Sequence, residues 1–256
     1  MSKKIAIITG ATGGLGRKFT EHLTREEVDE IWAIARNEAK LEKLRDDFGK
    51  KIITISKDLS DNKSLDDIGE MLAEQKPEVK FLINNAGMGK MGSYKDFSIT
   101  EIEKTIDINC KAAAVLCSIC VPYMKNGDII MNIASQASFQ PDPYLNMYAA
   151  TKAFLRSYSR ALNVELEDTG ITVTAVCPGW VDTEMLSKEI NGQKVEFPGL
   201  VSAERVVEQA FKDAKNGRDM SVCTMHVKCQ HVMAKLFPQK AVMKTWVRSI
   251  RRYVQK

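Results

Sequence analysis

The sequence predicts a three-layer α/β fold in which a doubly wound, parallel sheet carries helices on both faces. Two observations support this. Short, β-branched apolar runs alternate along the chain with longer segments of helical periodicity. Several of these runs, such as IAII and ITVTAV, are apolar without a break, as is typical of strands covered on both faces. The 256 residues, 44% of them hydrophobic, are enough for one core and predict a single domain.

Six strands are expected in the order of the chain, each followed by a helix-like segment. Glycines mark two of the boundaries. Asn126-Gly127 predicts a turn before the fifth strand, and Gly170 predicts a left-handed helix end before the sixth. The expected strands are Lys4–Thr9, Ile31–Ala35, Ile52–Ser56, Phe81–Asn84, Asp128–Ile133 and Thr172–Cys177.

A glycine-rich turn joins the first strand to the helix that follows it. The run TGATGGLG places Gly10, Gly14 and Gly16 at this junction, where missing side chains let the backbone turn tightly and its N–H groups approach a pyrophosphate. Gly10 and Gly14 are two residues further apart than the first two glycines of GxGxxG. Because a strand precedes the run and a helix follows it, the run predicts a dinucleotide site rather than an ordinary tight turn.

The end of the second strand indicates which dinucleotide binds. A carboxylate about 20 residues beyond the glycines holds the adenosine ribose 2′-hydroxyl of NAD, whereas an arginine accommodates the 2′-phosphate of NADP. Here the two positions are Ala35 and Arg36, so no carboxylate repels a phosphate and Arg36 offers a charged fork to bind one. We therefore expect NADP(H). The alternative is that Arg36 is a solvated residue that opens the next helix.

Tyr148, Lys152 and Ser135 carry the chemistry of carbonyl reduction. Hydride transfer to a ketone leaves an alkoxide, which needs a proton donor whose pKa lies near the working pH. Lowering a tyrosine pKa from about 10 to about 7 takes ~4 kcal/mol of preference for the phenolate. The Lys152 ammonium, one helical turn on in YAATK, supplies part of this, and a positive nicotinamide ring adds more. Ser135 would hydrogen-bond the substrate oxygen as an oxyanion donor.

Together these motifs resemble those of the short-chain dehydrogenase/reductase family, over nearly everything up to about residue 225. TGATGGLG is similar to the family's cofactor loop, and NNAG at 84–87 to its fourth-strand signature. DIN, NIAS, YAATK and PGWVDT then follow in the family's order. The resemblance implies a Rossmann-type dinucleotide-binding and catalytic domain over residues 1–225, similar to NADP(H)-preferring bacterial ketoreductases and hydroxysteroid dehydrogenases.

The resemblance also implies roles for single residues. Its catalytic group would be Asn109, Ser135, Tyr148 and Lys152, in which Asn109 holds a water that connects Lys152 to solvent. Ser138 competes with Ser135 for its role, at a less fitting distance from Tyr148. Asp58-Leu59 would contact the adenine, and PGWVDT would hold the nicotinamide carboxamide. The cofactor-binding residues implied are Gly10, Thr12, Gly13, Gly14, Leu15, Gly16, Arg36, Asp58, Leu59, Asn85, Ala86, Gly87, Tyr148, Lys152, Pro178, Gly179, Val181 and Thr183.

The substrate is expected in the loops after the fifth and sixth strands, at the carboxyl edge of the sheet. Apolar, aromatic and thioether groups dominate there, which favours a bulky hydrophobic carbonyl or alcohol such as a steroid or lipid-derived ketone. Two alternatives are a 3-oxoacyl carrier-protein reductase, whose acidic carrier a basic tail would recruit, and a non-catalytic NADP(H)-sensing protein. The loop residues are Gln136, Phe139, Pro141, Tyr144, Leu145, Trp180, Met185 and Leu186.

Positive charge is concentrated at the end of the chain. The net charge is +4, but residues 221–256 hold eight Lys or Arg and no Asp or Glu. The rest of the chain therefore has a net charge of about −4 (4 minus 8), which gives no basis for nucleic-acid binding. We expect 226–256 to be a basic amphipathic segment that packs on its own domain or on a partner subunit; the alternatives are contact with anionic lipid and docking of an acidic carrier protein. The stripe is Met243, Val247, Ile250 and Val254, opposite Lys244, Arg248, Arg251 and Arg252.

The cysteines predict free thiols. Most of the six lie in apolar runs of a chain too large to need disulfides, which indicates a reducing, cytoplasmic location. Cys117 and Cys120 are expected on a helical core face rather than in a redox motif. The run Cys223, His226, Cys229 and His231 has zinc-like spacing but lacks a distant second ligand pair, so we expect no metal.

Two apolar helix-like runs bear on membranes and assembly. The run Ala112 to Met124 is shorter than the roughly 20 residues of a membrane span, so no transmembrane segment is expected. This run and Ala153 to Leu166 carry more apolar surface than one sheet face needs. Because relatives pair subunits through the corresponding helices, the resemblance implies a homodimer or homotetramer.

Overall fold

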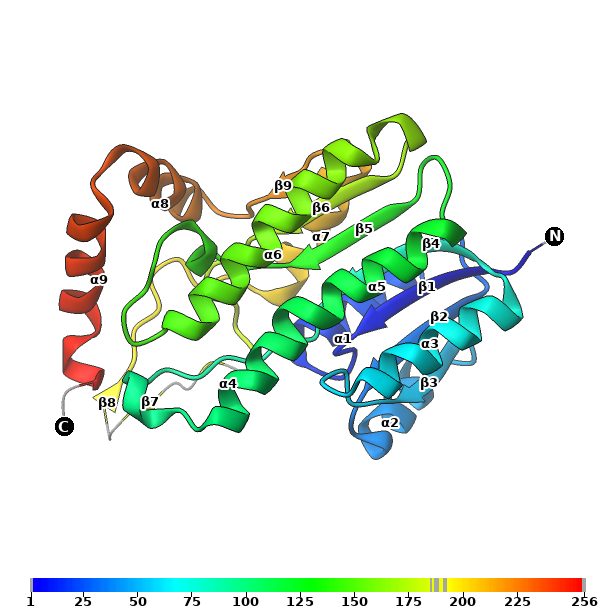
Figure 1. The fold of residues 1–256 in the computed structure, drawn as a ribbon, viewed down its shortest axis with the longest axis horizontal. Coiled ribbons are helices and arrows are strands. Elements are labelled where there is room, and N and C mark those ends of the chain that lie inside the picture. Colours follow the sequence, from blue (N-terminus) through cyan, green and yellow to red (C-terminus); the bar gives the residue numbers. More distant parts are fainter. Residues whose placement is uncertain (1, 185, 187–188, 191–192, 255–256) are drawn as a thin grey trace.

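The computed structural model describes residues 2–184, 186, 189–190 and 193–254, and it has the three expected layers, a central sheet with helices on both sides (Figure 1). Seven parallel strands lie in the order β3-β2-β1-β4-β5-β6-β9. The chain order reverses between β1 and β4, and ligands bind beyond the carboxyl ends of strands at such a switch point. The strands are β1 (Lys4–Thr9), β2 (Glu30–Ala35), β3 (Ile52–Ser56), β4 (Glu78–Asn84), β5 (Ile129–Ile133), β6 (Thr172–Val176) and β9 (Met220–Ser221).

Helices cover both faces of the sheet because each strand is apolar on both sides. Phe19, Leu41 and Phe211 belong to the core under α1, α2 and α7, whereas Ile68 and Leu116 belong to the core under α3, α5 and α6. The helices are α1 (Gly14–Leu23), α2 (Glu38–Phe48), α3 (Asn62–Gln75), α4 (Ile99–Ile106), α5 (Ala112–Cys120), α6 (Asn146–Glu165), α7 (Ala203–Lys215), α8 (Met225–Leu236) and α9 (Gln239–Val254).

The strands differ little from those the sequence predicts. The bounds of β1 and β3 are those expected, and β2, β4, β5 and β6 differ at their ends by one to three residues. The sequence analysis missed β9, because two residues have no periodicity and this strand exists only through its pairing with β6. It also missed the small hairpin of β7 (Glu189–Ile190) and β8 (Gln193–Lys194).

One described helical stretch, residues 99–123, is long and apolar enough by length and composition to cross a membrane. The helix is therefore longer than the run 112–124 on which the expectation was based, because a π-helical turn at Asp107–Lys111 joins α4 to α5 without a break. Half of the apolar window is buried inside the protein, and Leu116 and Cys117 are fully buried against the sheet. Packing on the sheet thus accounts for the apolar character of this helix.

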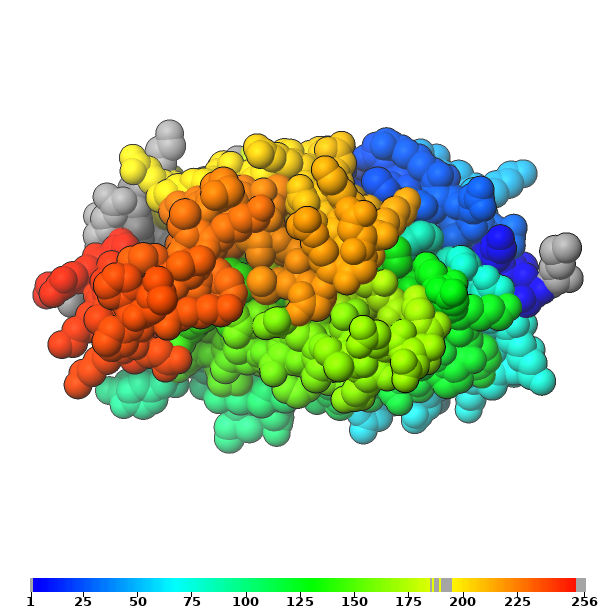
Figure 2. Space-filling model, turned by 90° about the horizontal axis from the view of Figure 1, so that it is seen from above, coloured from blue at the N-terminus to red at the C-terminus, as the bar shows by residue number. Residues whose placement is uncertain are grey.

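Helices α8 and α9 form one end of the molecule, opposite the amino terminus (Figure 2). The apolar side of α9 packs inward: Ile250 is buried, and the indole Nε1 of Trp246 donates a hydrogen bond to the carbonyl oxygen of Pro143 at 2.9 Å. The side chains of Val254, from the expected apolar stripe, and of Arg252, from the opposite basic side, lie outside the described residues.

Candidate active site

The glycine turn between β1 and α1 is closely packed. Gly10 has a φ of +62°, and a Cβ at Gly16 would lie 2.1 Å from the carbonyl oxygen of Gly10. A Cβ at Gly14 would lie 2.8 Å from the Thr183 Cβ, so the glycine turn touches the loop after β6. Helix α1 has neither a side-chain N-cap nor an acidic residue in its first turn, which leaves its first N–H groups for an anion. The turn therefore fits a pyrophosphate.

Asn85 and Thr9 lock the end of β4 to the glycine turn. The Asn85 side-chain amide donates to the carbonyl oxygens of Thr9 and Gly10, at 3.2 and 3.0 Å. In return, the hydroxyl of Thr9 accepts from the backbone N–H groups of Asn85 and Ala86, at 3.0 and 2.9 Å. The sequence analysis missed Thr9, although a polar residue that ends an apolar strand was a usable signal.

Arg36 lies exposed at the end of β2, where an adenosine ribose would lie. Asp58 is close enough for the guanidinium to act on it. The backbone N–H of Ser60 holds the pKa of Asp58 below its usual value, and the Ser60 hydroxyl and the charge of Arg36 lower it further. The neighbouring Leu59 has its side chain in the core.

Asn109 lies inside the π-helical turn at Asp107–Lys111, and it is 1% exposed. Its Oδ1 accepts from the backbone N–H of Met88 at 2.9 Å. Its Nδ2 donates to the carbonyl oxygen of Met88 at 2.8 Å and to the hydroxyl of Thr151 at 2.9 Å. Asn109 thus ties the loop after β4 to the helix that carries Tyr148. π-Turns within α-helices are frequent at functional sites, but no local pattern in the sequence predicts this one.

Lys152 is buried on α6, and its Nζ donates to the carbonyl oxygen of Ile133 at 2.6 Å. Burial lowers the pKa of Lys152 to about 8. Gly87 lies against both Lys152 and Asn109: a Cβ at this glycine would be 3.2 Å from Nζ and 3.4 Å from the Asn109 Oδ1. The missing side chain of Gly87 therefore lets the loop after β4 lie close to both polar groups.

Tyr148 lies one turn before Lys152 on α6, with the Lys152 Nζ 5.7 Å from the centre of its ring. Burial raises the pKa of the Tyr148 phenol, and a hydrogen bond with the Ser135 side chain acts in the opposite direction. This differs from the low pKa expected of the complete site, because the protein alone supplies burial but not the positive nicotinamide ring. The Tyr148 ring packs on Gly89, where a Cβ would lie 2.5 Å from Cδ2.

Ser135 follows β5 and also caps a short 3₁₀ turn, where its Oγ accepts from the N–H of Ala137 at 3.1 Å. The Ser135 side chain acts on the Tyr148 phenol and lowers its pKa, so the structure places these two side chains close together. Ser138 points elsewhere. It is 2% exposed, and its Oγ lies 3.9 Å from the Cys177 sulfur.

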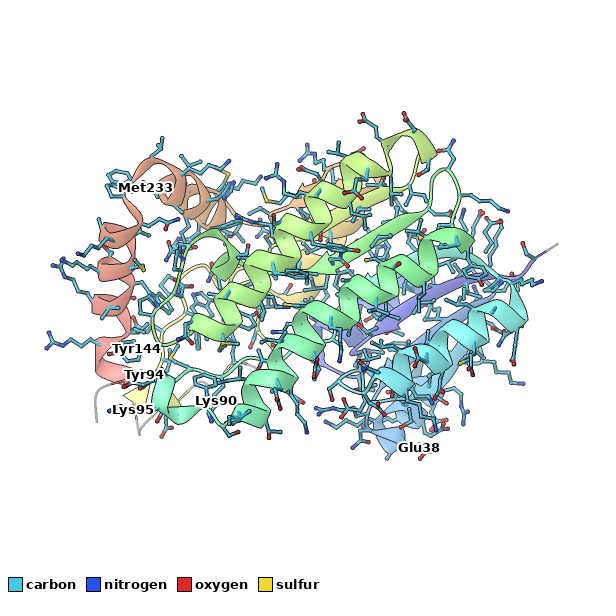
Figure 3. All side chains as sticks on the ribbon, in the orientation of Figure 1. Glu38, Lys90, Tyr94, Lys95, Tyr144 and Met233 are labelled. Atoms are coloured by element: carbon cyan, nitrogen blue, oxygen red, sulfur yellow. The ribbon has the colours of Figure 1, made fainter. Side chains whose placement is uncertain are left out.

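The loop from β5 to α6 contains most of the expected substrate residues. Tyr144 has a left-handed backbone, φ +65°, held by a bond from the N–H of Gly92 to its carbonyl oxygen at 2.8 Å. Figure 3 places Tyr144 close to Tyr94, near α9. Leu145 ends the loop as the residue before α6, and its N–H donates to the carbonyl oxygen of Asp142 at 3.0 Å. Asp142 is buried, which raises its pKa to about 6; the sequence analysis missed it.

Two further residues of this loop turn toward other elements. The Oε1 of Gln136 is buried without a hydrogen-bond partner among the described residues and lies beside Gly179. The Phe139 ring packs on His231 of α8, with centroids 4.2 Å apart, and on the guanidinium of Arg156. The expected substrate loop is therefore in contact with both C-terminal helices.

The loop after β6 runs back to the glycine turn. Pro178 accepts from the N–H of Gln136 at 2.8 Å, and Val181 pairs with Val201. Trp180 packs on Phe197 with centroids 5.1 Å apart. Leu186 donates through its N–H to the carbonyl oxygen of Thr183 at 3.1 Å, whereas Met185 lies outside the described residues.

The described residues contain no group of three or more His, Cys, Asp or Glu side chains placed to hold a metal ion. His231, from the zinc-like run, packs on Phe139, and Cys229 is exposed. All six cysteines are free thiols.

Comparison with known proteins gives concordant findings. The model of the short chain dehydrogenase family matches residues 4–194. Oxidoreductase UcpA of Escherichia coli K12 is 30% identical over 210 residues, which are 80% of this chain and 79% of that protein. A short-chain dehydrogenase from Sphingobium yanoikuyae in complex with NADPH has a TM-score of 0.77 at 25% identity and covers 99% of this chain and 97% of its own. The bulky-bulky ketone specific alcohol dehydrogenase from Comamonas testosteroni has a TM-score of 0.73 at 25% identity, covering 93% and 96%.

Proposed function

Because this chain belongs to the short-chain dehydrogenase family, we propose that it is an NADP(H)-dependent oxidoreductase that interconverts a secondary alcohol and a ketone. The observation that carries the proposal is the joint placement of Tyr148, Ser135 and Lys152 at the carboxyl edge of the sheet, beside a glycine turn that fits a pyrophosphate. The NADPH bound to the Sphingobium relative supports the choice of cofactor.

A bound nicotinamide would supply or accept the hydride. In the reducing direction, Ser135 would donate a hydrogen bond to the ketone oxygen, and the Tyr148 phenol would give that oxygen its proton. The phenolate that remains is stabilised by the Lys152 ammonium. Asn109 would hold a water that connects Lys152 to solvent and so replaces the proton, and Gly87 lies against both side chains.

The cofactor would lie across the ends of β1, β2 and β4. The first turn of α1 would hold the pyrophosphate, and Arg36 the 2′-phosphate. Asp58 and the segment 85–87 would line the adenosine side, and 178–183 the nicotinamide side. Replacing Arg36 tests the preference: Arg36→Asp should weaken NADPH binding far more than NADH binding. An equal loss for both would remove the assignment.

The substrate we propose is a bulky hydrophobic ketone or alcohol, such as a steroid or lipid-derived ketone. Phe139, Tyr144 and Trp180 supply aromatic groups in the loops after β5 and β6, and the ketone-specific Comamonas relative supports the substrate class. NADPH absorbance followed with a panel of steroid, acyl-thioester and small aromatic ketones tests this, with Tyr148→Phe as the inactive control. Turnover of acyl thioesters alone would favour a 3-oxoacyl carrier-protein reductase, and no turnover would favour a sensor.

We further propose that the protein works in the cytoplasm as a homodimer or homotetramer, with residues 226–256 covering the domain formed by 1–225. Exposed apolar side chains on α6 support the assembly: Val164 is 67% exposed, and Phe154 stacks on Tyr158 at the surface. Light scattering on the purified protein tests the assembly. A monomer at micromolar concentration would contradict it.

A further inference from the structure

Helix α8 is apolar on two opposite sides. Val227 is buried, and it packs beside Ala134 and Cys177 in a small core cluster. On the other side, Val232 is 50% exposed and Leu236 72%. Because successive helical residues are about 100° apart, Val232 and Leu236 lie within about 40° of each other around the axis, and Val227 lies roughly opposite. The packing that explains one apolar side leaves the other uncovered.

The exposed apolar surface continues beyond α8. Met233 and Phe237 are each 49% exposed, and Met225, at the start of the helix, is exposed as well. Figure 3 shows Met233 at the end of the molecule formed by the C-terminal helices. We call this set the outer stripe; it consists of Met225, Val232, Met233, Leu236 and Phe237.

Lysines and an arginine accompany the outer stripe without acidic partners. Lys228 and Lys235 lie along one edge of it on α8, and α9 adds three more exposed cations. None of the five forms an ion pair within the described part of the chain, and residues 220–256 contain no Asp or Glu. The five are Lys228, Lys235, Lys240, Lys244 and Arg248.

We propose that the outer stripe and these five cations form a docking surface for anionic lipid. Exposed aliphatic and aromatic side chains beside Lys and Arg are the composition of an interfacial helix, in which the apolar groups enter the acyl boundary and the cations contact the headgroups. A second copy of the chain fits less well, because a two-fold contact would place the same unpaired cations opposite each other.

The docking surface is joined to the expected substrate loop. His231 of α8 packs on Phe139, and Trp246 of α9 is bonded to Pro143. Both contacts reach the segment that follows Ser135. A protein bound to lipid through α8 would therefore hold this loop near the bilayer, where a hydrophobic ketone concentrates.

Flotation of the full-length protein with vesicles tests the proposal. Vesicles of phosphatidylcholine are compared with vesicles that also contain phosphatidylglycerol, at low and at high salt. We expect the protein to float with the anionic vesicles at low salt and to be released at high salt. The variant Lys228→Gln/Lys235→Gln/Lys240→Gln should partition about 100-fold less, and Leu236→Ser/Phe237→Ser about tenfold less.

Matched variants outside the docking surface are the controls. Lys50→Gln/Lys51→Gln/Lys76→Gln makes the same change in charge at exposed sites, and Ile99→Ser removes an exposed apolar side chain from α4. Both should partition within about twofold of the parent. Partition is measured without turnover, so the result is independent of the proposed function.

Three results would overturn the proposal. One is the absence of flotation with anionic vesicles at low salt. The second is an equal loss of flotation in the control variants. The third is a failure to bind vesicles combined with binding to another partner. Binding to an acidic polypeptide such as polyglutamate would assign the surface to an acidic protein. Self-association that is lost in Leu236→Ser/Phe237→Ser would assign it to a second copy of the chain.

Discussion

Lys152 donates a hydrogen bond from its Nζ to the backbone carbonyl oxygen of Ile133, at 2.6 Å. The bond holds a buried ammonium at the carboxyl end of β5. Ser135 lies two residues after Ile133, the last residue of this strand. Burial brings the pKa of this ammonium down to about 8, so its charge changes within the range in which the enzyme is assayed.

The first prediction concerns the pH dependence of ketone reduction. Since the Lys152 pKa is about 8 rather than 10.5, the ammonium is present below that pH and is lost as the pH rises through it. The phenol is protonated over the same range, so kcat/KM should be level below about pH 7 and fall above about pH 8. Initial rates from about pH 6 to 10 measure this. A profile that stays level to about pH 10 would show that Lys152 has no part in the protonation step.

Gly87→Ala should lower kcat by about tenfold or more, and should lower kcat more than it weakens NADPH binding. The added Cβ would lie 3.2 Å from the Lys152 Nζ and 3.4 Å from the Asn109 Oδ1, and it would crowd both polar groups. Steady-state kcat and fluorescence titration of NADPH separate the two effects. Gly69→Ala in α3 is the control, because a Cβ there would meet nothing within 4 Å. Full kcat in Gly87→Ala would rule out proton passage beside this residue.

Gly14→Ala should weaken NADPH binding by about tenfold, whereas Gly69→Ala in α3, where a Cβ meets nothing within 4 Å, should change it less than about twofold. The difference arises because a Cβ at Gly14 would lie 2.8 Å from the Thr183 Cβ, and the loop after β6 must then shift. Calorimetric titration with NADPH measures both variants. Equal NADPH affinity in the two variants would contradict the assigned contact between the glycine turn and the loop after β6.

Asp142→Asn should raise the free energy of unfolding by about 1–3 kcal/mol at about pH 7.5. The folded pKa of about 6 lies above the unfolded value of 3.8, so ionisation of Asp142 costs stability as the pH rises through this window. Below about pH 4 Asp142 is protonated in both the folded and the unfolded protein, and the stability gain of Asp142→Asn should vanish. Urea unfolding at the two pH values measures it, with exposed Asp66→Asn as the control. A gain that persists at low pH would point to a cause other than charge.

The sequence predicts the parts of this protein that local pattern determines. β1 (KIAIIT) and β3 (IITIS) are rich in β-branched residues, so their bounds follow from local composition. Ser135 and Tyr148 meet because one follows β5 and the other begins the next helix. In contrast, the π-helical turn around Asn109 accompanies a bond to Thr151, 42 residues away, and no local pattern contains that distance.

The C-terminal helices also have one feature that the sequence predicts and one that only the folded structure determines. The inward packing of α9 follows from an apolar stripe that is visible in the sequence, although its bonded member, Trp246, was not among the residues singled out. The second apolar side of α8 could not be predicted, because only the fold decides which side of a helix is covered. The raised pKa of Asp142 likewise depends on burial by the assembled loop.

The measurement that tests the central claim most directly is the ionisation of the Tyr148 phenol, followed by ultraviolet difference spectra of the parent against Tyr148→Phe. In the protein alone, burial raises this pKa above its usual value of 10. With NADP⁺ bound, the account predicts that the phenol ionises at about pH 7, because the positive nicotinamide ring then adds to the effect of the Lys152 charge. Ionisation at or above about pH 10 in that complex would contradict it.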